Sequence, residues 1–125
     1  MSFQAKTILF GLLLTFVVVV VGAFVRLTDA GLGCPDWPGC YGKPTPAHAA
    51  ADIAKAVDEQ GGVHGPVSHQ KAWNEMIHRY LAGALGLVIL LIASMAWASR
   101  ASRGLPTALV GVVCFQAALG MWTVT

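Results

Sequence analysis

The chain has 125 residues, of which 56% are hydrophobic and only 11% are charged, and its mean hydropathy is +0.66. Soluble domains carry about 25% charged residues. Every charged residue lies in residues 26–79, apart from Lys6, Arg100 and Arg103, so three long segments carry no charge. This distribution excludes an ordinary water-soluble domain and a disordered chain, and it indicates an integral membrane protein.

The three uncharged segments are long enough to cross a membrane as helices. They cover residues 8–25, 80–99 and 105–125, and each spans roughly 30 Å of hydrocarbon at the helical rise. A helix satisfies its own backbone polar groups in lipid. The alternative for the first segment is a secretory signal, but its apolar run exceeds the usual ~7–15 residues and no clear cleavage site follows it. The sequence therefore predicts an all-α integral membrane protein with three transmembrane helices.

Basic residues beside these segments predict their orientation. Lys6 precedes the first segment, and Arg100 and Arg103 lie in the short connection between the second and the third. The positive-inside rule then places the N-terminus and this connection in the cytoplasm. Residues 26–79 would accordingly form an external loop.

The loop of residues 26–79 is far longer than a usual connection, so we expect it to be functional. Its first part, residues 31–42, is rich in glycine and proline and predicts tight turns. Its last part, residues 71–79, reads as an N-terminal extension of the second membrane helix.

A short helix is predicted inside the loop, over residues 46–60. Thr45 is placed as its N-cap, Pro46 suits its first turn, and two glycines follow its end. Ile53 and Val57 lie on one side of it. This mild amphipathicity suits a helix that lies against the membrane.

Cys34 and Cys40 flank a short segment that contains two prolines and a glycine, so we expect the chain to fold back between them. In an oxidising compartment such a pair forms a disulfide, which contributes roughly 2 kcal/mol to stability. The alternatives are free thiols or a zinc site that includes loop histidines, although the spacing exceeds the usual C-x₂₋₄-C of zinc ligands. The loop histidines, for which we otherwise expect a solvated role, are His48, His64 and His69.

A few other residues in and near the membrane segments have a simple structural interpretation. Cys114 is expected to be a small buried residue, and Gln116 is expected to form an interhelical hydrogen bond. Ala82 and Gly86 form a small-xxx-small pair that favours close helix packing. Trp37 is expected to anchor the chain at the membrane interface.

Glu75 and His78 are the strongest candidates for chemistry. They are three residues apart, so on a helix they share one face, and they lie where the loop enters the membrane. Ionisable groups at that depth are costly unless they are paired or ligated, and a neutral imidazole is a natural axial ligand for haem iron. The alternative is structural: Glu75 favours the positive end of the helix and pairs with Lys71 or Arg79, and His78 is an ordinary interfacial residue.

Two runs of residues resemble the N-terminal part of the haem A synthase family. They are GAFVRLTDAGLGCPDWPGCYG, residues 22–42, and WNEMIHRYLAGALGL, residues 73–87. The run FQAALGMWTVT, residues 115–125, is similar to the third helix of that family. The resemblance covers essentially the whole chain. It implies that residues 1–125 form three helices of an incomplete four-helix haem-binding bundle.

The resemblance also implies an activity and a set of site residues. The family converts haem O to haem A, oxidising one porphyrin methyl to a formyl group for use in cytochrome oxidase. By this resemblance Glu75 is the catalytic carboxylate, His78 is the axial ligand of the haem iron, and Cys34 and Cys40 form the disulfide of the first external loop. The implied location is the inner (plasma) membrane, and no nucleic-acid partner is expected.

The sequence departs from the family pattern in one respect. The family pairs the histidine of its second helix with another on its fourth helix, and holds haem b in a second, C-terminal bundle. No histidine follows His78 in this sequence. We therefore expect a truncated or split N-terminal portion, completed by the missing C-terminal bundle or by a homo-oligomer. A non-catalytic haem-binding or haem-delivery module and a purely structural membrane subunit remain the alternative functions.

Overall fold

A computed structural model describes residues 1–28, 30, 33–100 and 102–124. Five residues lie outside this description: Asp29, Gly31 and Leu32 near the start of the loop, Ala101 in the short connection before the third span, and Thr125 at the end of that span. The described part of the chain is all-helical. Its elements in chain order are α1 (Phe3–Leu27), α2 (Ala50–Glu59), α3 (His69–Ala98) and α4 (Gly104–Val124).

Helices α1, α3 and α4 are long and apolar enough to cross a membrane, which confirms the predicted class of a multi-pass, all-α membrane protein. Polar caps explain why two of them start earlier than the apolar runs. The Ser2 hydroxyl accepts a hydrogen bond from the Ala5 N–H at 3.1 Å, and the Ser68 hydroxyl accepts one from the Lys71 N–H at 3.1 Å. The predicted extension of the second membrane helix into the loop is therefore part of α3.

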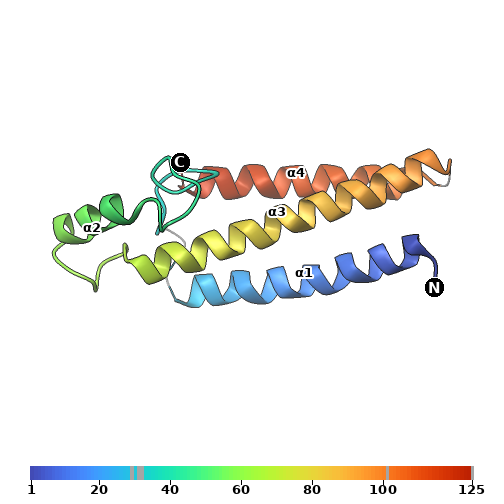
Figure 1. The fold of residues 1–125 in the computed structure, drawn as a ribbon. Coiled ribbons are helices and arrows are strands. Elements are labelled where there is room, and N and C mark those ends of the chain that lie inside the picture. The colour runs from blue at the N-terminus through green and yellow to red at the C-terminus, as the bar shows by residue number, and fades with distance from the viewer. Residues whose placement is uncertain (29, 31–32, 101, 125) are drawn as a thin grey trace.

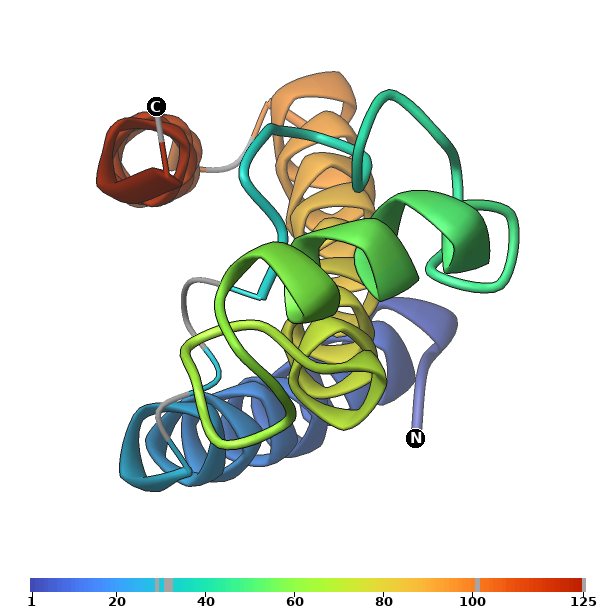
Figure 2. The same ribbon diagram turned by 90° about the vertical axis from the view of Figure 1, so that its left-hand side faces the viewer.

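Helix α3 is the centre of the molecule. Figure 1 shows α1 and α4 running beside it, with the loop and α2 gathered beyond one end of the helices. In the end-on view of Figure 2, α1 and α4 lie apart, on different sides of α3. Helix packing within the described residues accordingly joins α3 to α1, to α4 and to α2, but does not join α1 to α4.

The contact between α1 and α3 is close because a glycine faces the neighbouring helix. A Cβ atom at Gly11 would lie 3.3 Å from side-chain carbons of Val88 and Ile92. A Cβ atom at Gly86 would lie 3.8 Å from a side-chain carbon of Val113. Gly86 is therefore at the contact between α3 and α4, as the small-xxx-small pattern predicts.

Two predictions for α4 are wrong. Cys114 is exposed instead of buried. Gln116 is also exposed, and its side chain forms no interhelical hydrogen bond within the described part of the chain. The reason is that, among the described helices, α4 packs only against α3, so most of its surface faces away from the other helices.

The loop folds around a small core of its own. This core consists of Cys34, Cys40, Ala49, Ile53, Ala72 and Met76, so it joins the cysteine segment, α2 and the first turns of α3. The prediction that the apolar side of α2 lies against the membrane is therefore wrong, because Ile53 is fully buried in this core. Helix α2 also begins later than predicted. Thr45 accepts a hydrogen bond from the His48 N–H at 3.3 Å in the turn before the helix.

Candidate functional site

Glu75 is a buried carboxylate near the loop end of α3, with only 5% of the residue exposed. Its Oε2 atom accepts a hydrogen bond from the backbone N–H of Cys34 at 2.9 Å. Its Oε1 atom pairs with the Nη2 of Arg79, one helical turn along α3. Because a buried charge is costly unless it is paired, these donors explain how the carboxylate is accommodated.

Arg79 connects this carboxylate to the cysteine loop. Its Nη1 atom donates to the backbone carbonyls of Asp36 and Gly39, at 2.8 and 2.7 Å. Lys71, the other partner that the sequence offers to Glu75, donates instead to the carbonyl of Gly65 at 3.1 Å. Of the two basic residues four positions from Glu75, only Arg79 is its partner.

Cys34 and Cys40 form a disulfide, and both are fully buried. The sulfur atoms are already bonded to each other, so neither the free-thiol nor the zinc alternative holds. The carboxylate of Asp36 closes the turn by accepting hydrogen bonds from the N–H groups of Tyr41 and Gly42, each at 2.6 Å. Burial, followed by the charges of nearby carboxylates, raises the pKa of the Tyr41 phenol.

The loop approaches α3 through its backbone at Gly33. A Cβ atom there would lie 2.7 Å from the backbone N of Ala72, so only glycine allows this approach. The short contact brings the neighbouring Cys34 N–H to Glu75. The loop is therefore positioned by backbone contact as well as by the charged pair.

The His78 ring is half-buried and lies against α1 instead of the loop. A Cβ atom at Gly22 would come within 2.9 Å of its Nε2, so the ring packs directly against the backbone of α1. Glu75 and His78 are thus neighbours on α3, but Glu75 contacts the loop and His78 contacts α1. No hydrogen bond joins them among the described residues.

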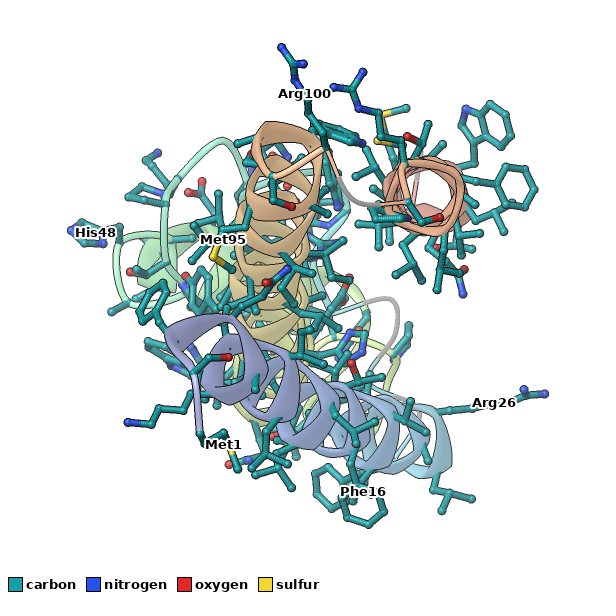
Figure 3. The ribbon with its side chains drawn as sticks, turned by 90° about the vertical axis from the view of Figure 1, so that its right-hand side faces the viewer. Met1, Phe16, Arg26, His48, Met95 and Arg100 are labelled. Carbon is teal, nitrogen blue, oxygen red and sulfur yellow. A yellow bond between two sulfur atoms is a disulfide. The ribbon has the colours of Figure 1, made fainter. Side chains whose placement is uncertain are left out.

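The three loop histidines take no part in this arrangement. His48, His64 and His69 are exposed, and Figure 3 shows His48 pointing away from the helices. Nowhere in the described ranges do three or more His, Cys, Asp or Glu side chains gather in a way that could hold a metal ion.

The side chain of His78, although not its present orientation, suits one axial position on a haem iron. The ring is a potential imidazole donor in a half-buried position between two apolar helices. The apolar groove between α3 and α4, with a volume of about 220 Å³, begins at Gly83 and is not lined by His78. The chemistry of the donor therefore fits, and the ring has to turn from α1 before it can present its Nε2 atom.

Sequence reasoning singled out Glu75, His78 and both cysteines as candidates, but it did not predict two features of their surroundings. It weighed Arg79 only as a helical partner of Glu75, and it gave no role to Gly22. Arg79 follows Glu75 by four residues, a spacing that favours an ion pair on a helix. No local pattern reveals that the same guanidinium also reaches the loop carbonyls.

A comparison with known protein families gives a match that contains all of these residues. Residues 5–125 match the model of the COX15-CtaA family, described as cytochrome oxidase assembly protein. The chain belongs to this family. The match includes the cysteine loop, the buried Glu75 with its partner Arg79, and the membrane helices.

Relatives of the chain within this family are named haem A synthase. The protein from Shewanella oneidensis is 46% identical over 118 residues, which cover 91% of this chain and 34% of the relative. The protein from Caulobacter sp. is 39% identical over 83% of this chain and 29% of the relative, and that from Mesorhizobium japonicum is 32% identical over 90% and 35%. The chain thus spans about a third of the length of these relatives. No solved structure matches it significantly.

Proposed function

We propose that this chain contributes a haem O site to haem A synthesis, in which one methyl group of the porphyrin is oxidised to a formyl group. The observation that carries the proposal is the buried Glu75 carboxylate one helical turn before His78. The names of the relatives support it, since each is a haem A synthase. The substrate in this proposal is haem O, and its product serves cytochrome oxidase.

His78 would supply an axial nitrogen ligand to the iron of haem O. Its position near the loop end of α3 favours binding near the membrane surface. Because its Nε2 lies against Gly22, binding requires the ring to rotate away from α1. The role of this residue is to hold and orient the substrate.

Glu75 would act on the reacting carbon. A fixed carboxylate can stabilise positive charge that develops at the methyl carbon, and it can accept protons as oxidation proceeds to the aldehyde. The oxidation takes up the oxygen of one water and releases four protons and four electrons, which the iron and macrocycle of the haem would pass to an external electron acceptor. The donors from Cys34 and Arg79 would hold the carboxylate in one direction while this occurs.

The disulfide supports an orientation for the chain. Disulfides persist in oxidising compartments outside the cytoplasm, and the Cys34–Cys40 bond lies in the long loop. We therefore place residues 26–79 outside and the N-terminus in the cytoplasm, in the inner (plasma) membrane. Lys6, Arg100 and Arg103 agree with this orientation.

A haem-binding or haem-delivery module without turnover is the second candidate. The observation that favours it is the pairing of both Glu75 oxygens with donors from the protein. Such pairing also suits a carboxylate that only fastens the loop to α3. The proposal and this alternative differ in whether haem A is formed.

The test is to express the gene that encodes this chain in cells that make haem O but no haem A. Haem pigments are then extracted from the membranes and separated by chromatography. We expect haem A with the unaltered gene and none with His78→Ala. The matched control is His69→Ala, because His69 lies on the same helix but is exposed. Haem A formation that is equal in His78→Ala and the unaltered protein would refute the proposed site.

A further inference from the structure

Arg79 is the residue that joins α3 to the disulfide loop. Its side chain is only 12% exposed, and its guanidinium contacts a carboxylate on α3 and two carbonyls in the loop. Nη2 pairs with Glu75, while Nη1 donates to the carbonyls of Asp36 and Gly39. Both carbonyls lie within the ring that the Cys34–Cys40 disulfide closes.

We propose that Arg79 is a positioning residue that fixes the Glu75 carboxylate against the disulfide loop. Glu75 is held from two sides, since its Oε2 accepts from Cys34 and its Oε1 pairs with Arg79. The Arg79 guanidinium is in turn held by the loop carbonyls of Asp36 and Gly39. The orientation of the Glu75 carboxylate therefore depends on the Arg79 guanidinium, whose two Nη atoms bind the carboxylate and the loop.

Only arginine can make this set of contacts. Its planar guanidinium carries five N–H donors in a rigid fork, so one nitrogen can serve the carboxylate while the other serves two carbonyls. The single ammonium of a lysine carries the same charge but concentrates its donors at one point. Arg79→Lys thus keeps the charge and loses the geometry, which makes it the informative variant.

The inference rests on the proposed function wherever haem A formation is the readout, but the state of the loop can be measured independently. We would place Arg79→Lys and Arg79→Gln in the native gene and prepare membranes. The matched control is Lys71→Gln. Lys71 is also four residues from Glu75, but it contacts Gly65 instead.

The first measurement is the rate at which Cys34 and Cys40 become alkylated under mild reduction. Losing hydrogen bonds to a charged group loosens the loop, so we expect about a tenfold faster rate in both Arg79 variants and no change in Lys71→Gln. If Arg79→Gln fails to accumulate in the membrane, Arg79→Lys decides. An unchanged rate in Arg79→Lys would overturn the proposal.

The second measurement separates positioning from folding. In Arg79→Lys we expect haem A formation to fall by about tenfold or more, while the amount of haem O bound per protein stays the same. A proportional loss of bound haem O or of protein from the membrane would overturn the positioning role, because it would show that Arg79 only maintains the fold. Because Arg79 acts through Glu75, adding Arg79→Lys to Glu75→Gln should lower haem A formation no further, and a further loss would overturn the role.

The two measurements also tell apart the failure of this inference and that of the proposed function. Normal haem A formation in Glu75→Gln would refute the catalytic role of Glu75, whatever the alkylation rates are. An unchanged alkylation rate in Arg79→Lys would refute the role of Arg79, even if Glu75→Gln is inactive.

Discussion

At the scale of single residues, Gly22 determines where the candidate haem ligand lies. The His78 ring rests against the backbone of α1 because Gly22 has no side chain, and a Cβ atom there would come within 2.9 Å of Nε2. An ordinary van der Waals contact is longer. The ring or the helix would therefore have to move if any other residue replaced this glycine.

The first prediction is that Gly22→Ala destabilises the packing of α1 on α3. Overpacking of this kind costs about 1–3 kcal/mol, and we expect a lower free energy of unfolding in detergent micelles. The control is Gly111→Ala in the interior of α4, where the new Cβ meets no atom within 4 Å. Both changes gain about the same helix propensity, so their difference isolates the contact with His78. Equal stability of the two variants would contradict this interpretation.

At the scale of elements, the loop is fastened to α3 by a backbone contact and by charged hydrogen bonds close together. Gly33 brings the loop backbone against Ala72, and the next residue donates its N–H to Glu75. The disulfide holds the rest of the loop in a small ring. The loop and the first turns of α3 therefore form one packed unit.

The second prediction follows from this contact. Gly33→Ala places a methyl group against the backbone of Ala72, which cannot turn aside as a side chain can. We expect the free energy of unfolding to fall by roughly 2 kcal/mol or more, because strain and the loss of the Cys34–Glu75 bond add together. The change is measured by denaturant unfolding in micelles. Gly120→Ala, which meets no atom within 4 Å, serves as control, and a loss as large in the control would rule out this explanation.

The sequence predicted these elements better than it predicted their contacts. The uncharged runs predicted the membrane helices, and the spacing of four residues offered Lys71 and Arg79 as partners of Glu75, because both are local properties of a helix. Only the structure shows that the partner is Arg79. The hydrogen bond from Cys34 to Glu75 joins residues that are 41 positions apart, so no periodicity contains it. The prediction that Ile53 faces the membrane was wrong for the same reason. Its partners come from the cysteine loop and α3, whereas amphipathicity alone cannot distinguish a protein core from a membrane surface.

At the scale of the whole molecule, α3 separates two helices that do not touch each other. Large apolar side chains face outward on all three long helices, for example Phe16, Leu87 and Phe115 with 69%, 71% and 62% exposed. Figure 3 shows Phe16 pointing away from the other helices. Such surfaces are stable in lipid, so the membrane is part of the folded state.

The third prediction concerns the topology of the three spans. The C-terminal end of α4 lies at the same end of the molecule as the loop, opposite the N-terminus (Figure 1). With the N-terminus in the cytoplasm, a reporter enzyme that works only outside should be active when fused after Val124 and inactive when fused after Ser102. The reverse pattern would contradict the orientation drawn from the basic residues and the disulfide.

The most direct test of the central claim is the pigment content of membranes that carry Glu75→Gln. Glutamine keeps the size of the side chain and loses its charge, so we expect haem O to stay bound at the unaltered level. Haem A formation should fall about a hundredfold or more, as expected for loss of a general base. Glu59→Gln, which removes a largely exposed carboxylate paired with Lys55, should leave both pigments unchanged. Normal haem A formation in Glu75→Gln would contradict the claim that this carboxylate serves catalysis.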